Sequence, residues 1–266
     1  MQIPTPPLSL TNQRAIVTGI NRELGATIAT TLAMAGCRVV GIYYNELERV
    51  TPVVDAVTAA GGTLYAIQAD LRHVSENERI VAEAVRILGG LDIFVANSGV
   101  TVFGPIEQMN EQSWDNVFDL NVKGAYFGAR AAALQMKAQG TPGAIVFSSS
   151  VTGITAMAGA SIYGTSKAAL RHIAATLAVE LAPAQIRVNA VAIGATLNER
   201  NLVDDPNYAQ TWAQLAPVGR VGQPQDVADT VLYLCSPLAS MLVGQTLIID
   251  GGWTWTSPLI PQDHTE

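Results

Sequence analysis

The sequence has little of what metal centres, disulfide-bonded domains and membrane segments are built from. Only two of its 266 residues are cysteine and three are histidine, and no CxxC spacing occurs, which argues against a metal framework. No apolar stretch reaches about 18 residues, and residues 1–7 lack the basic and apolar regions of a signal peptide. These absences predict a cytoplasmic chain with no membrane contact, with reduced, buried thiols at Cys37 and Cys235.

Positive charge is scarce as well. The chain has 15 Lys and Arg against 22 Asp and Glu, which gives a net charge of −7. The basic residues are scattered rather than clustered, and this pattern argues against nucleic acid or an anionic membrane as a partner. We therefore expect a small-molecule ligand, either neutral or carried by a cofactor.

What the sequence does contain is a regular alternation of segments. Short β-branched runs alternate with longer amphipathic runs rich in Ala and Leu, which is typical of βαβ units and of a parallel sheet covered on both faces. No linker or charge block divides the chain, so we expect one domain over residues 1–266. The predicted strands span 14–18, 37–44, 63–69, 91–96, 143–149, 186–192 and 245–249, and the predicted helices span 24–35, 46–60, 75–88, 111–137, 161–182 and 224–235.

Two segments depart from this alternation. Residues 194–222 form a long excursion without a strand pattern, and long excursions in compact domains are usually functional, so we interpret them as a mobile substrate lid. Residues 253–266 form a C-terminal tail. Its aromatic residues Trp253 and Trp255 predict an interface with another chain.

Polar and glycine residues follow the first, third and fourth strands. The first strand runs into Thr18–Gly25, a glycine-bearing turn before a helix, where a pyrophosphate can approach the backbone and rest on the helix N-terminus. Asp70 ends the third strand and Asn97–Gly99 ends the fourth, at the sheet edge where ligands bind in open α/β folds. A helix cap at Asp70 and a simple turn at Asn97–Gly99 remain as alternatives.

Tyr163 and Lys167 lie one helical turn apart, so their side chains leave the same helix face. An ammonium about 4–5 Å from a phenol stabilises the phenolate by roughly 3–4 kcal/mol, which would lower the pKa of Tyr163 towards neutrality. The spacing also arises by chance, with a half-buried tyrosine beside a solvated lysine. The other motifs of the chain support the functional interpretation of this pair.

Together these motifs resemble the short-chain dehydrogenase/reductase family from Thr18 to Gly252. The resemblance implies an α/β fold, a three-layer Rossmann-like doubly wound parallel sheet with about seven strands, and an enzyme that oxidises CH–OH groups with NAD or NADP as acceptor. It also implies a homotetramer. The matching segments are the turn at 18–25, Asn97–Gly99, Asn121, the serine-ended strand 145–150, the YxxxK motif at 163–167, 187–191 and 244–252.

The resemblance assigns roles at the reacting end. Tyr163 would be the general acid/base, and Lys167 would lower its pKa and hold the nicotinamide ribose. Ser150 lies thirteen residues before Tyr163 and would donate a hydrogen bond to the substrate oxygen. Asn121 would hold a relay water through its backbone carbonyl. Ser148 and Ser149 are rivals of Ser150, but strand alternation turns Ser149 to the opposite face, and Ser148 lies deeper in the sheet.

Three residues depart from the family pattern. Glu23 replaces the middle glycine of the turn and brings a negative charge close to the expected diphosphate, unless its side chain faces solvent while its N–H still serves. Ile193 and Asn198 replace a proline and a threonine near the nicotinamide carboxamide. The residues that the resemblance assigns to cofactor binding are Gly19, Asn21, Arg22, Leu24, Gly25, Tyr43, Asn45, Asp70, Leu71, Asn97, Gly99, Tyr163, Lys167, Gly194 and Thr196.

The choice of dinucleotide depends on charge. An acidic residue about twenty positions beyond the glycine turn binds the adenosine ribose in NAD sites and would repel a 2′-phosphate. Tyr43 stands there, with no carboxylate until Glu46, and Arg22 lies in the turn where NADP-using members often carry a basic residue. These features favour NADP(H) over NAD(H). Alternatively, Arg22 is a solvated surface residue that has no part in this choice, since NAD-using relatives also carry an arginine there.

The motifs say less about the substrate. We expect the substrate site to be lined by Val100–Phe103, Val151–Ile154 and the lid residues Thr196–Trp212. The family resemblance implies a secondary alcohol or ketone, or a sugar or polyol. The polar run 196–200 is similar to that of some sugar-oxidising relatives and favours a polyol or aldose, unless the charged lid is simply solvated. Reduction of a 3-oxoacyl thioester is an alternative, and so is a non-catalytic dinucleotide-binding sensor or scaffold on the same fold.

Overall fold

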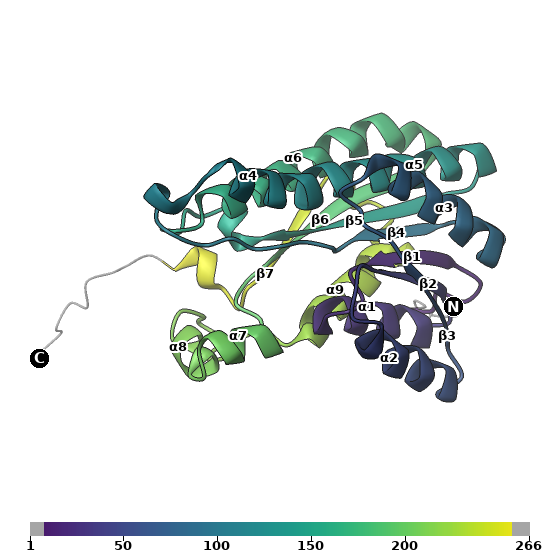
Figure 1. Ribbon diagram of the computed structural model, residues 1–266. Coiled ribbons are helices and arrows are strands. Elements are labelled where there is room, and N and C mark those ends of the chain that lie inside the picture. Colours follow the sequence, from purple (N-terminus) through teal and green to yellow (C-terminus); the bar gives the residue numbers. More distant parts are fainter. Residues whose placement is uncertain (1–7, 257–266) are drawn as a thin grey trace, which may run out of the picture.

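The computed structural model describes residues 8–256, and one parallel sheet runs through its centre (Figure 1). The strand order is β3-β2-β1-β4-β5-β6-β7, and every neighbouring pair is parallel. The order reverses between β1 and β4, and ligands of open α/β sheets bind at such a reversal. The strands are β1 (Arg14–Thr18), β2 (Arg38–Tyr43), β3 (Thr63–Gln68), β4 (Ile93–Ala96), β5 (Gly143–Ser150), β6 (Ile186–Ile193) and β7 (Thr246–Ile249).

Helices cover both faces of the sheet (Figure 1). Successive strand residues point to opposite faces, so Ile16 belongs to one buried apolar cluster and Val17 to the other. The first cluster lies beneath α3 (Val74–Leu88), α5 (Ala125–Gln139) and α6 (Ser161–Leu181). The second lies beneath α1 (Glu23–Met34), α2 (Leu47–Ala59) and α9 (Pro224–Cys235).

This architecture confirms the predicted doubly wound α/β fold, and each predicted strand lies within two residues of an observed one. The strands are predictable because both sheet faces are covered, so each strand reads as a short, nearly continuous apolar run. Cys37 and Cys235 are buried free thiols, as expected. Within residues 8–256, no helix is both long and apolar enough to cross a membrane, and no three potential metal ligands are grouped.

The predicted helix 111–137 is not continuous. It comprises α4 (Glu111–Phe118), the π-helical segment η2 (Asp119–Gly124) and α5. A π-turn widens the helix locally and is found frequently at functional sites. Here it coincides with Asn121, whose buried side chain accepts from Val100 N at 2.8 Å and donates to Val100 O at 2.9 Å.

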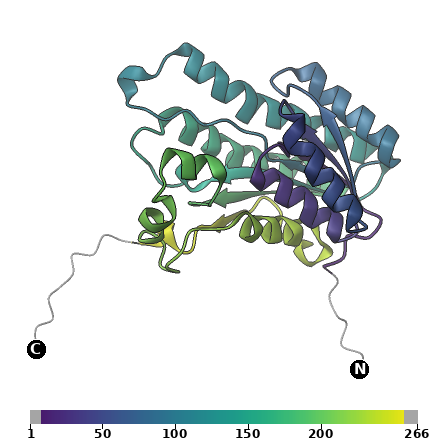
Figure 2. The same ribbon diagram turned by 60° about the horizontal axis from the view of Figure 1, so that its bottom comes forward.

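The expected lid has structure of its own. Residues 194–222 contain α7 (Glu199–Asp204) and α8 (Tyr208–Ala213), and a bridge pairs Thr196 with Gly222. Figure 2 shows these helices at the carboxyl end of the sheet, near the turn η6 (Trp253–Trp255). Of the predicted tail, residues 257–266 lie outside the described part.

Candidate active site

A cleft of about 950 Å³ runs along the carboxyl edge of the sheet beneath the lid. The turn after β1, the ends of β4 and β5, the first turns of α6 and the lid all contribute to its walls. With the exception of Asn121, every residue that the sequence assigned to catalysis or to cofactor binding lines this cleft. Asn121 lies behind the wall and holds the backbone of Val100.

The glycine turn is compact because its neighbours approach its backbone closely. Gly19 has φ of +78°, a left-handed conformation that favours glycine. A Cβ on Gly25 would lie 2.0 Å from the carbonyl oxygen of Gly19, so only glycine fits there. Asn97 joins the end of β4 to the turn, since its N–H donates to Thr18 Oγ1 at 2.9 Å and its Nδ2 donates to Thr18 O at 3.0 Å.

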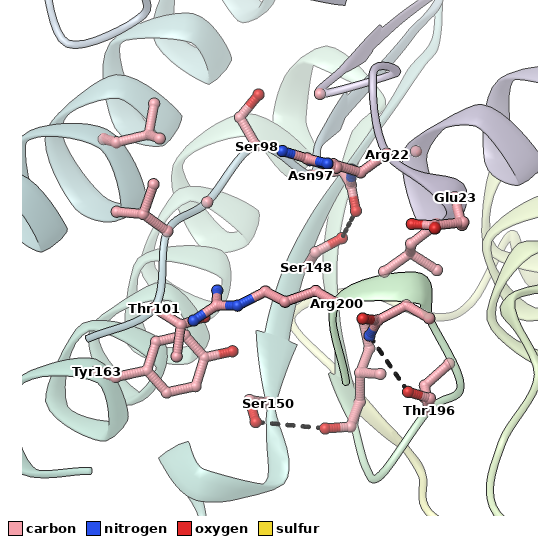
Figure 3. A pocket seen from close by; sticks show the side chains of 18 of the residues that line it. Arg22, Glu23, Asn97, Ser98, Thr101, Ser148, Ser150, Tyr163, Thr196 and Arg200 are labelled. Atoms are coloured by element: carbon pink, nitrogen blue, oxygen red, sulfur yellow. Dashed lines mark hydrogen bonds between the residues drawn. The ribbon is translucent and has the colours of Figure 1, made fainter. Parts of the chain in front are cut away.

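Glu23 lines the cleft beside the glycine turn. Its Oε1 accepts a hydrogen bond from the backbone N–H of Glu199 at 3.1 Å, so its carboxylate contacts the start of α7 in the lid (Figure 3). Its negative charge therefore stays close to the place expected for the diphosphate, and the contact with the lid is one that neither expectation included. The partner lies 176 residues away in the sequence, and no local pattern indicates it.

Carboxylates accompany the basic residues at the other end of the cleft. Arg22 Nη2 lies 3.1 Å from Glu46 Oε2, to which Asn21 Nδ2 also donates at 3.0 Å. Asp70 pairs with Arg72 at 2.6 Å, and this hydrogen bond holds the pKa of Asp70 below its usual value. Asp70 does not cap α3, whose N-cap is His73.

The Tyr163 hydroxyl faces the hydroxyl groups of Ser150 and Thr101 (Figure 3). Burial raises the pKa of Tyr163, while the polar influence of Ser150 and Thr101 and the positive charge of Arg200 oppose the rise. The edge of the Phe103 ring packs on Tyr163, with ring centroids 5.5 Å apart and an interplanar angle of 76°. Figure 3 shows Thr101, Ser150 and Arg200 around the phenol.

Lys167 lies on the same helix face as Tyr163 but acts differently from the expectation. Its Nζ donates to the carbonyl of Ser148 at 2.8 Å and lies 5.6 Å from the Tyr163 ring centroid. Burial lowers the pKa of Lys167 to about 8, because a charged ammonium is costly in an apolar setting. The predicted fall in the pKa of Tyr163 is therefore wrong in this structure, since burial disfavours the charged form of both groups.

The three serines at the end of β5 have distinct partners. Ser148 Oγ donates to Asn97 Oδ1 at 3.2 Å, and Ser149 Oγ donates to the Lys167 carbonyl at 2.7 Å. Ser150 Oγ donates to Ile193 O at 3.3 Å, and of the three serines it is the one that influences the pKa of Tyr163. The hydroxyl groups nearest the reacting end are thus those of Ser150, Tyr163 and Thr101, the last of which the sequence motifs do not single out.

The lid places charge and aromatic surface over this end of the cleft. Arg200 extends from α7 towards Tyr163 and Thr101 (Figure 3), and its Nε lies 3.5 Å from Asp204 Oδ2. Trp212 packs on Trp253 with ring centroids 5.4 Å apart. Trp253, expected at an interface between chains, lines the cleft instead, whereas Trp255 is 81% exposed.

Comparison with known proteins matches the chain to oxidoreductases over most of its length. The family model described as enoyl-(acyl carrier protein) reductase matches residues 19–254. The 3-oxoacyl-[acyl-carrier-protein] reductase FabG of Staphylococcus aureus is 36% identical over 239 residues, which cover 90% of this chain and 96% of that protein.

Solved structures agree with this match. A short-chain type dehydrogenase/reductase from Mycobacterium marinum superposes with a TM-score of 0.88 at 32% identity, covering 94% of this chain and 98% of the other. A putative 2-deoxy-d-gluconate 3-dehydrogenase from Agrobacterium tumefaciens with bound NADP gives a TM-score of 0.87 at 29% identity, covering 95% of this chain and 100% of the other. Both likenesses span the sheet, the cleft and the lid.

Proposed function

The chain belongs to the short-chain dehydrogenase/reductase family, and we propose that it transfers hydride between a nicotinamide cofactor, NADP(H) being favoured, and a secondary alcohol or ketone, or a sugar or polyol. The observation that carries this proposal is the grouping of Tyr163, Ser150 and Lys167 at the carboxyl edge of the sheet, in the same cleft as the glycine turn. We further propose that residues 1–266 act as one domain with residues 194–222 as a substrate lid.

The cleft has the features that a dinucleotide requires. The backbone of Gly19 and the N-terminus of α1 can receive a pyrophosphate because the turn has no side chain at Gly19 or Gly25. The ends of β2, β3 and β4 bring Tyr43, Asp70 and Asn97 to the same cleft. When bound there, a nicotinamide cofactor would supply or accept the hydride. We assign to it the cofactor residues predicted above, of which Gly194 and Thr196 lie at the start of the lid.

The preference for NADP(H) rests on charge. No carboxylate stands at Tyr43, and Arg22 lines the cleft nearby. Arg22 is paired with Glu46, whose side chain is half-buried at 24% accessible, but the Arg22 side chain is itself 55% accessible. Ion pairs near the surface contribute little, so a doubly charged 2′-phosphate can compete for the guanidinium. The Agrobacterium relative was solved with NADP bound, which supports the proposal.

We assign the proton to Tyr163, which gives it to a nascent alkoxide in reduction or takes it from the substrate hydroxyl in oxidation. Ser150 and Thr101 face the phenol oxygen, and Ser150 can bond the substrate oxygen and stabilise charge that develops on it. Lys167 is held by the Ser148 carbonyl next to the tyrosine and can orient a ribose by donating hydrogen bonds. Asn121 supports this wall by binding the backbone of Val100, and its backbone carbonyl is proposed as the site of a relay water.

The relatives support two substrate classes, and a non-catalytic function is a further alternative. Likeness to FabG supports reduction of a 3-oxoacyl thioester, and likeness to a putative gluconate-type dehydrogenase supports a sugar or polyol. A non-catalytic dinucleotide sensor is the alternative that Glu23 favours, because its charge lines the same cleft as the glycine turn. We propose a cytoplasmic homotetramer, on family resemblance.

The test is a panel of sugars, polyols, cyclic ketones and acyl thioesters, assayed with NAD(H) and NADP(H) by nicotinamide absorbance. We expect turnover of at least one class and a higher kcat/KM with NADP(H). Binding of a dinucleotide without turnover of any class would favour the sensor. A purified, folded protein that binds neither dinucleotide would refute the proposed function.

A further inference from the structure

Glu23 connects the glycine turn to the lid. It is the first residue of α1, and its Oε1 accepts from the backbone N–H of Glu199, the first residue of α7, at 3.1 Å. Backbone N–H groups in the first turn of a helix lack partners within that helix, and a carboxylate is a favourable acceptor for them. One side chain therefore joins the starts of two helices that are distant in the sequence.

A second contact holds the same lid residue from α2. Arg49 Nη1 lies 2.5 Å from Glu199 Oε2, and Arg49 Nε lies 3.3 Å from Glu46 Oε1. Glu199 is thus held through its backbone by Glu23 and through its carboxylate by Arg49, and we call these two contacts the lid clasp. Both contacts are exposed, so each contributes little alone, and together they tie the start of α7 to α1 and α2.

The lid clasp crosses the cleft at the place proposed for the diphosphate. The cleft is lined by Glu23 and Leu24 from the start of α1 and by Asn198 and Arg200 from the lid, and Figure 3 shows Glu23 and Arg200. A diphosphate resting on the N-terminus of α1 would lie between these two pairs of residues. We propose that Glu23 is a positioning residue: by tying the lid to the glycine turn, it slows the release of bound dinucleotide. The proposal rests on the proposed function, because it requires a dinucleotide in the cleft.

Glu23 has two opposing effects that an experiment must separate. Its negative charge disfavours a nearby diphosphate, while its hydrogen bond to the lid favours retention. Glu23→Gln removes the charge and keeps an acceptor oxygen at the same distance along the side chain. Glu23→Ala removes both, and alanine is well tolerated in a helix. Since both variants lack the charge, the difference between them reports the hydrogen bond alone.

The first measurement is limited trypsin digestion without dinucleotide. Trypsin can cut after Arg200, in the first turn of α7, and such cleavage requires the segment to open locally. We expect cleavage about fivefold faster in Glu23→Ala than in Glu23→Gln, the effect of one hydrogen bond. Cleavage after Lys137, in the last turn of α5, is the internal control for global unfolding. Equal rates after Arg200 in the two variants would overturn the inference.

The second measurement is the release rate of NADPH, followed by its fluorescence in stopped flow. We expect release about fivefold faster from Glu23→Ala than from Glu23→Gln, a higher KM for NADPH, and similar single-turnover rates of hydride transfer. A difference in trypsin cleavage without a difference in release would make the contact purely structural and overturn the positioning role. If neither dinucleotide binds either variant or the wild type, the proposed function fails, and the trypsin rates still show whether Glu23 docks the lid.

Discussion

Replacing Lys167 by methionine should stabilise the fold while it removes activity. Burial lowers the pKa of Lys167 from 10.5 to about 8, and such a difference corresponds to about 3 kcal/mol of stability lost where the lysine is charged in both states. Methionine removes this penalty and fills a similar volume. It also leaves the Ser148 carbonyl without its 2.8 Å hydrogen bond, which costs about 1 kcal/mol. The expected net gain is about 2 kcal/mol at pH 7.

The pH dependence of this gain gives the stricter test. Below the folded-state pKa the lysine is charged in both states, so the wild type carries the whole penalty. Between pH 8 and 10.5 the folded protein loses its proton first, the unfolded chain binds more protons, and wild-type stability rises with pH. The advantage of Lys167→Met should therefore disappear above this range.

Urea unfolding of both proteins at several pH values, with equal m-values as a condition, measures the difference. Lys167→Arg is the matched control, because its charge cannot be lost and its deficit should persist at high pH. A methionine variant that is less stable than the wild type at pH 7, or a gain that does not change with pH, would refute the reasoning from burial.

The remaining predictions concern turnover. Tyr163→Phe keeps the packing on Phe103 but should lower kcat by about 10²–10⁴-fold and leave the dinucleotide Kd within a few-fold; activity above a tenth of wild type would require another acid. Tyr43→Asp should shift the ratio of kcat/KM values towards NAD, and an unchanged ratio would contradict the charge argument. Arg200→Gln removes a charge that lowers the pKa of Tyr163, so the pKa in the pH profile of kcat/KM should move upwards; no shift or a downward shift would count against this role.

The sequence predicts the sheet well because its signal is local. Strands covered on both faces read as apolar runs, and the glycines at 19 and 25 mark a turn that tolerates no side chain. The interruption of helix 111–137 has no such signal, because the apolar spacing continues through it. Its associated contact is between Asn121 and the backbone of Val100, which the fold alone brings together.

At the site, too, residue spacing predicts some features, whereas others depend on the surroundings of each side chain in the fold. Helical spacing correctly places Tyr163 and Lys167 on one face, yet it gives the wrong direction for the pKa of Tyr163, because spacing carries no information on burial. The sequence also marks Glu23 as unusual. Its partner, Glu199, becomes visible only when the lid folds back over the turn.

Burial shifts the pKa values of Tyr163 and Lys167 so that each side chain favours its uncharged form. The pKa of Tyr163 is raised and that of Lys167 is lowered, so the phenol keeps its proton at neutral pH. A protonated tyrosine is ready to act as the acid of ketone reduction, whereas alcohol oxidation needs a phenolate that the site disfavours. Among the described residues, Arg200 is the charged group that opposes the effect of burial on this pKa. We therefore expect the rate of ketone reduction to be highest where the phenol is protonated, and the rate of alcohol oxidation to rise as the pH increases towards the pKa of Tyr163.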